Sequence, residues 1–279
     1  MSSNGNRAKA IAIASPGHAV FAATLVILGI MGAIRGEFTA IWTGVPRGFP
    51  ARQALAYLCA ALSLVCGMGL LWRHAAVVAS RVLLTSLLLW LLLFRVPNVF
   101  RFPNAIGTWW GCGDTAVMAS AAWVLYAWFA GDWDRQRVGF ATGDKGLRIA
   151  RVLYGLGLIP FGVAHFIYLK ETVVLVPGWL PWHVGWAYFT GATFLAASLA
   201  LLTGVLGRLA STLSALQMGL FGLLVWVPLV ARGSLSAFQW GEVVITVALT
   251  AAGWVVTDSY RGTPWLTTRR RSSNASFQT

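Results

Sequence analysis

Long apolar runs alternate with short polar connections along most of the 279-residue chain. A bilayer core about 30 Å thick needs roughly 20 apolar residues per helix, and eight runs come close to that length. The pattern therefore predicts an all-α integral membrane protein with eight transmembrane helices. The predicted helices lie near residues 18–34, 53–72, 76–96, 112–130, 149–168, 184–204, 206–230 and 240–257.

Composition excludes the other broad classes. The chain is 58% hydrophobic and only 10% charged, with a mean hydropathy of +0.71, whereas a soluble domain carries about 25% charged residues. Three cysteines without a CxxC pair exclude a disulfide scaffold. The sequence contains no Walker A, GxGxxG or GxSxG motif and no HxxH, HxxxH or ExxH pair, so it predicts neither a nucleotide site nor a metal site.

The placement of basic residues predicts the orientation. The net charge is +13, but Lys and Arg lie between the apolar runs, which argues against a nucleic-acid surface. Fourteen of the 21 Lys and Arg residues fall on the side that holds both chain ends. We therefore expect both ends on the cytoplasmic side of a bacterial inner membrane. Arg7 and Lys9 precede the first run as in a signal peptide, but no A-x-A cleavage site follows and the run has a later counterpart.

The chain aligns with itself without a gap when it is shifted by 131 residues. Val45-Pro46 falls on Val176-Pro177, and Trp109 falls on Trp240. These matches predict a tandem duplication, and four helices per unit make the two repeats parallel rather than inverted. The predicted parts are a cytoplasmic N-tail (1–17), a first four-helix bundle (18–130), a cytoplasmic linker (131–148), a second bundle (149–258) and a basic, disordered C-tail (259–279).

Ionisable and aromatic residues gather on the predicted outer side. The first connection of each unit is long and rich in aromatic residues, which suits either interface anchors or a lid over a cavity. Asp114 and Glu242 each lie near the start of a fourth helix, where a carboxylate is favoured. Arg95 and Arg101 flank Pro97, so we expect an Arg–carboxylate pair with Asp114. Ionisable groups within spans usually face a bundle interior or a wet cavity.

His165 lies near the outer end of the fifth predicted helix, after Pro160. The proline is expected to kink the helix and to leave a carbonyl unpaired. One hypothesis is that His165 binds such a carbonyl or Glu242, and the other is that it binds a ligand or handles protons. Ile34 stands at the matching position of the first unit, so the second hypothesis places any such role in the second unit alone.

The second unit resembles the DoxX-like family of small four-helix bacterial membrane proteins. The resemblance rests on GVAHF (162–166), on VPGWLPWHVGWAYFTGATFLAASLALLTG (176–204) and on the Val-Pro pair at 227–228. The first unit looks like a diverged copy of the second, because it keeps the Val-Pro pairs but lacks the histidine and the Thr-Gly pair. The resemblance implies four-helix bundles and a link to oxidoreductase or quinone-linked systems, and hence a membrane redox partner.

Three functions remain open at this point. The first is a non-enzymatic bundle that binds a lipid or a quinone-like ligand at its outer face. The second is a small-molecule transporter or permease, and the third is an enzyme that uses His165 with Glu242 or Asp114 as an acid–base pair; oligomerisation is left open. The predicted ligand site, under the segment 176–183, consists of His165, Trp179, Trp182, His183, Tyr188, Arg232 and Glu242, with Arg95, Arg101 and Asp114 as a secondary polar cluster.

Overall fold

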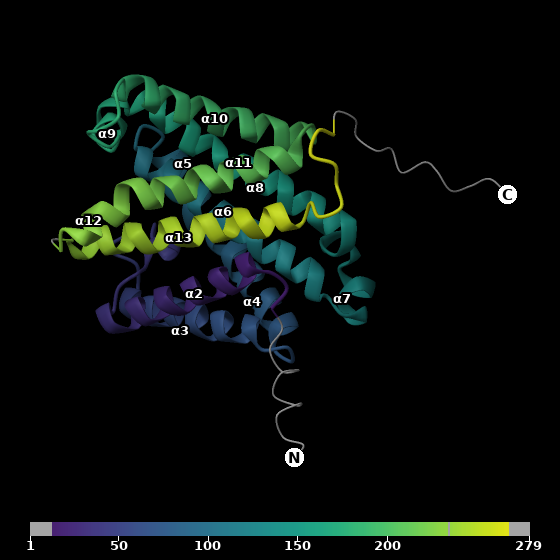
Figure 1. Cartoon of the computed structure of the whole chain (residues 1–279). Coiled ribbons are helices and arrows are strands. Elements are labelled where there is room, and N and C mark those ends of the chain that lie inside the picture. The colour runs from purple at the N-terminus through teal and green to yellow at the C-terminus, as the bar shows by residue number, and fades with distance from the viewer. Residues whose placement is uncertain (1–12, 234, 268–279) are drawn as a thin grey trace, which may run out of the picture.

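The computed structural model describes residues 13–233 and 235–267. Over these residues the chain is a bundle of helices without a strand (Figure 1). In chain order the helices are α2 (Pro16–Arg35), α3 (Arg52–Leu71), α4 (Ala76–Trp90), α5 (Val96–Arg101), α6 (Ile106–Phe129), α7 (Asp132–Arg137), α8 (Gly143–Ile167), α9 (Leu169–Val173), α10 (His183–Thr203), α11 (Gly207–Phe221), α12 (Val227–Ala231) and α13 (Ala237–Asp258). Two 3₁₀ turns are η1 (Ala40–Trp42) and η3 (Gly139–Ala141), and two π-helical segments are η2 (Leu91–Arg95) and η4 (Gly222–Trp226).

Seven helices in the described part of the chain are long and apolar enough to cross a membrane. The protein is therefore a polytopic membrane protein whose apolar helices face the lipid bilayer. The seven are Pro16–Arg35, Arg52–Leu71, Ala76–Arg101, Gly143–Ile167, His183–Thr203, Gly207–Ala231 and Gln239–Asp258. Each corresponds to one of the predicted spans, and the span predicted at 112–130 corresponds to α6, which is not among the seven.

The helix α6 lies in the middle of the bundle, packed against α4, α8 and α13 (Figure 1). Every residue from Thr115 to Ala127 is buried. Its crossing with α8 is close because glycines meet there: a Cβ on Gly113 would lie 2.8 Å from the carbonyl oxygen of Gly157. Small residues that let backbones approach are typical of helix contacts in membranes.

The start of the first helix and the end of the last lie at the same end of the bundle. A guanidinium nitrogen of Arg261, just after α13, lies 3.5 Å from the carbonyl oxygen of Ala14, just before α2. We call this the α7 end, because α7 also lies there, and the other the α9 end (Figure 1). Residues 259–267, assigned to the C-tail from the sequence, turn back at the α7 end: Leu206 donates to the carbonyl of Thr267 at 2.9 Å. The remaining tail residues, 1–12 and 268–279, lie outside the described residues.

Several local features recur at a spacing of 131 residues. The π-helical segments begin at Leu91 and Gly222, and a proline follows the end of each segment by two residues. A proline lacks the N–H of the regular helix ladder, and a π-bulge is one way in which a helix absorbs such an interruption. Left-handed backbone precedes α3 and α10, with φ of 50° at Ala51 and 58° at Trp182.

Candidate functional site

The predicted ligand residues His165, Trp179, Trp182, His183 and Tyr188 lie on α8, on α10 and on the connection between them, at the α9 end. His165 is half-buried, and its Nδ1–H donates to the carbonyl of Phe161 at 2.7 Å. The acceptor is a helix carbonyl, but it is neither of the partners that the hypothesis named. Pro160 leaves the carbonyl of Leu156 without its donor, and His165 binds neither that carbonyl nor Glu242.

The aromatic residues of this group are largely exposed. Trp182 is 86% exposed and adopts a left-handed backbone conformation, which is rare and strained for a bulky residue. Trp179 is exposed as well, and the ring of Tyr188 lies 5.6 Å from that of Phe166. His183, which follows Trp182 in the chain, is half-buried. Its Nε2 is buried without a hydrogen-bond partner among the described residues.

Arg232 and Glu242 lie apart from this group in the chain. Arg232 is exposed directly after α12, and Glu242 is half-buried on α13. Within the described part of the chain, no hydrogen bond or ion pair links either residue to His165 or to His183. The acid–base pair that the enzyme hypothesis requires, His165 with Glu242 or Asp114, is therefore not formed by direct contact in this structure.

The secondary cluster is centred on Arg95, which is buried at the end of η2. Its Nε donates to Thr115 at 3.1 Å and one terminal nitrogen donates to the carbonyl of Ala40 at 2.7 Å. Its other terminal nitrogen lies against the backbone of Gly111. It fits there because a Cβ atom on residue 111 would lie 2.1 Å from this nitrogen. In the described residues no carboxylate lies within 4 Å of Arg95, so the predicted contact pair with Asp114 is replaced by neutral acceptors.

Asp114 lies on α6 in the neighbourhood of Arg95 and of Glu242 on α13. Among the described residues it forms no ion pair with Arg95. Arg101, the third predicted member of the cluster, is instead exposed. It lines an open cavity of about 420 Å³ with residues 102–105 at the α9 end.

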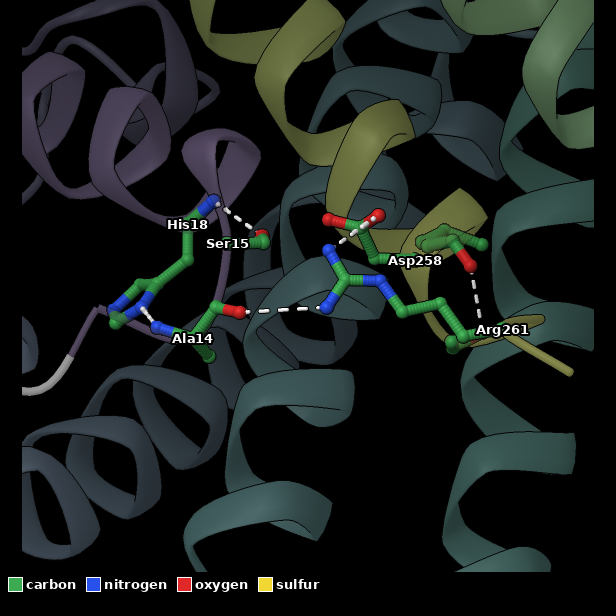
Figure 2. A network of polar contacts seen from close by, with 7 residues as sticks. Ala14, Ser15, His18, Asp258 and Arg261 are labelled. Carbon is green, nitrogen blue, oxygen red and sulfur yellow. Dashed lines mark hydrogen bonds and ion pairs between the residues drawn. The ribbon is translucent and has the colours of Figure 1, made fainter.

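The sequence analysis did not predict the polar network at the α7 end (Figure 2). The backbone N–H of Ala14 donates to Nδ1 of the buried His18 at 3.1 Å, and Ser15 Oγ accepts from the N–H of His18. Arg261 bridges Ala14 and Asp258, with 3.1 Å to Asp258 Oδ1. A cavity of about 290 Å³ lies among these residues. Only the i,i+3 spacing of Asp258 and Arg261 signals part of this network in the sequence.

A second buried carboxylate at the α7 end is Asp134 of α7, which is 1% exposed. Arg81 lies 2.7 Å from Oδ1, Tyr126 donates its hydroxyl at 2.8 Å, and the N–H of Gly131 donates at 3.2 Å. Burial raises the pKa of this carboxyl, but the hydrogen bonds from Tyr126, Arg81 and Gly131 outweigh burial, and the pKa lies below its ordinary value. Asp134 therefore fastens the connection between the two halves of the chain to α4 and α6.

Comparison with known proteins yields no family: no family model, no curated protein and no solved structure matches this chain. Among the described residues, no group of three or more His, Cys, Asp and Glu side chains could hold a metal ion. The site is therefore interpreted from its own geometry.

Proposed function

We propose that the chain is an eight-helix membrane protein made of two parallel four-helix units. The recurrence at 131 residues of the π-helical segments and of the left-handed residues before α3 and α10 supports a duplication. The hydrogen bonds recur too: Arg95 donates to Thr115 at 3.1 Å, and Trp226 donates to Thr246 at 3.0 Å. An even number of crossings, with α6 as the eighth span, is supported because the start of α2 and the end of α13 share one end of the bundle.

The α7 end is the cytoplasmic one in this proposal. It holds nine of the 16 Lys and Arg residues in the described part of the chain, and five more precede or follow that part. In a cysteine-free background, Gln136→Cys should resist an impermeant external thiol reagent, whereas Gly178→Cys should react. Both positions are exposed, so the reverse pattern would overturn the orientation.

The second unit, in this proposal, binds a lipid- or quinone-like hydrophobic ligand at the α9 end. The observation that carries the proposal is the exposed, strained Trp182 beside the unpartnered Nε2 of His183. An imidazole N–H without a partner suits a carbonyl or ester oxygen, and the neighbouring indole suits a ring or an acyl chain. These residues fit a quinone or a lipid ester, and they would bind and orient it.

The difference between the two units supports this placement. At the positions of Trp179, Trp182 and His183 the first unit has Gly48, Ala51 and Arg52. The resemblance of segment 176–204 to the DoxX-like family, whose members are linked to quinone systems, leads to the same ligand class and to a membrane redox partner. The ligand class and the redox partner that the resemblance implies rest on sequence likeness and are part of the proposal.

The test is ligand binding by the full-length protein in detergent, with decylubiquinone as the quinone probe and native mass spectrometry of co-purified lipids. Trp182→Ala and His183→Ala should each lower binding at least roughly tenfold, and His165→Ala should weaken it. Phe100→Ala, which removes another exposed aromatic side chain at the same end, is the matched control and should leave binding unchanged. Equal losses in the control, or unchanged binding in Trp182→Ala and His183→Ala, would refute the proposal.

A transporter is the second candidate, and the observation that favours it is Asp114. This carboxyl lies on the central helix near charged groups of both halves, and duplicated bundles often hold a substrate or coupling ion between their halves. Flux of a proton or substrate across proteoliposomes that Asp114→Asn abolishes would favour the transporter over the binding protein.

A further inference from the structure

The carboxyl group of Asp258, at the end of α13, is only half paired. Its side chain is 10% exposed, and Oδ1 lies 3.1 Å from a guanidinium nitrogen of Arg261. Oδ2 is buried and has no hydrogen-bond partner among the described residues. A carboxylate at the C-terminal end of a helix also faces the negative end of the helix dipole, so this oxygen calls for a cationic donor.

The space beside Asp258 can hold such a donor. A cavity of about 290 Å³ is lined by Ala14, Trp128, Asp258, Ser259 and Arg261. Figure 2 shows the Asp258 carboxylate and the Arg261 guanidinium between the end of α13 and the start of α2. The cavity is open and lies at the lower end of the range for small-molecule pockets, about 300–1,000 Å³, so it suits a headgroup or an amine.

We propose that this cavity seats the phosphoethanolamine headgroup of phosphatidylethanolamine. The primary ammonium group donates to the Asp258 carboxylate, which rotates to present its unpartnered Oδ2 to the cavity, and the phosphate lies against the exposed guanidinium of Arg261. Both contacts are charge-assisted hydrogen bonds, the strong class. The indole of Trp128 lines the same cavity and offers an aromatic surface to the ammonium group.

The chemistry favours this headgroup over its rivals. A trimethylammonium group, as in phosphatidylcholine, has no N–H to give to Oδ2. A divalent cation needs several oxygen ligands, whereas Asp258 is the sole carboxylate of the cavity lining in the described residues. The cavity also lies at the end of the helices, where the half-exposed Trp254 and Trp265 are typical of headgroup depth.

The first unit lacks the equivalent residues of this site. The positions 131 residues before Asp258 and Arg261 hold Ala127 and Ala130, both buried. The site lies at the opposite end of the bundle from Trp182, and the proposal does not rest on the proposed function.

The experiment measures lipid adducts of the full-length protein by native mass spectrometry. Dioleoyl phosphatidylethanolamine, phosphatidylcholine and phosphatidylglycerol are added at equal concentration, and free phosphoethanolamine is a fourth arm that separates a lipid from a soluble ligand. The wild-type protein should bind phosphatidylethanolamine roughly tenfold more strongly than phosphatidylcholine, and Asp258→Asn should abolish this preference.

The matched control is Asp132→Asn, because Asp132 and Arg135 form the same i,i+3 pair at the α7 end but are exposed. It removes the same charge and should keep the preference. Ala14→Phe fills the cavity and leaves the Asp258–Arg261 pair in place, so it should lose the preference even if Asp258→Asn fails to fold.

Four results would overturn the proposal. The first is equal binding of phosphatidylethanolamine and phosphatidylcholine by the wild-type protein. The second is a preference that survives in both Asp258→Asn and Ala14→Phe. The third is stronger binding of phosphatidylglycerol that is unaffected by Asp258→Asn, which would make Arg261 the centre of an anionic-lipid site. The fourth is binding of free phosphoethanolamine at low concentration without binding of phosphatidylethanolamine, which would assign the site to a soluble amine phosphate instead of a lipid.

Discussion

Asp134 is the residue whose removal should weaken the α7 end most clearly. Asp134→Ala leaves the buried hydroxyl of Tyr126 and the N–H of Gly131 without their acceptor. Arg81 contributes less to the loss, because its side chain is 38% exposed and can turn to water. Gly131 is an exposed residue, so its N–H also contributes less. We therefore expect a loss of about 2–4 kcal/mol in the free energy of unfolding, chiefly because the buried hydroxyl of Tyr126 loses its acceptor and, to a smaller extent, because Arg81 loses its partner.

Equilibrium unfolding of the purified protein in mixed micelles with increasing SDS, followed by tryptophan fluorescence, measures this loss. Asp134→Asn keeps the volume and one acceptor and should lose about 1–3 kcal/mol. Asp132→Ala, two residues away but exposed, is the control and should change stability by less than about 0.5 kcal/mol. An Asp134→Ala protein as stable as the Asp132→Ala protein would refute the reasoning.

The wild-type protein and Asp134→Asn together also test a pH dependence of stability. The folded pKa of Asp134 lies below its ordinary value, so its contribution is fully present above the unfolded pKa of about 3.9. It is lost as the pH falls through the folded pKa. The stability difference between the wild-type protein and Asp134→Asn should therefore be constant from about pH 7 to pH 5 and shrink below about pH 4. A difference that grows on acidification would contradict the assignment.

Three further substitutions test the packing, all by the same unfolding measurement. Gly111→Ala should lose about 1–3 kcal/mol, because its Cβ would lie 2.1 Å from a terminal nitrogen of Arg95; full stability would show that the guanidinium relocates freely. Gly113→Ala should lose a similar amount, about 1–3 kcal/mol, because its Cβ would lie 2.8 Å from the backbone oxygen of Gly157, and an unchanged protein would mean that α6 and α8 do not cross so closely. Ile34→Ala should change stability by less than about 0.5 kcal/mol, because Ile34 is 80% exposed; a large loss would place it in a contact.

The helices were predictable because the length of an apolar run is a local property. The run at 53–72 corresponds to Arg52–Leu71, and the run at 184–204 corresponds to His183–Thr203. The prediction was poorest for the starts of α6 and α8, each of which begins six residues before its predicted start. In α6 the added residues include Trp109 and Trp110. Hydropathy does not register an aromatic turn at a membrane boundary as helix.

The side-chain partners were less predictable, because they depend on contacts between distant segments. One hypothesis paired His165 with the carbonyl freed by Pro160 or with Glu242, whereas His165 donates to the carbonyl of Phe161. Arg95 was expected to meet Asp114, yet it donates to Thr115 and Ala40. The contact of Ala14 with Arg261 joins residues 247 positions apart, and no periodicity in the sequence marks such a pair.

The burial of α6 has a consequence for how the chain enters the membrane. A helix that leaves the insertion machinery alone meets lipid on all sides, and an ionisable residue within a span is expensive there. In the folded bundle α4, α8 and α13 pack around α6, which carries Asp114. If α6 crosses the membrane as proposed, its stable insertion should require α8, which is synthesised later. Biogenesis would then be cooperative across the midpoint of the chain, and neither half should insert correctly when it is expressed alone.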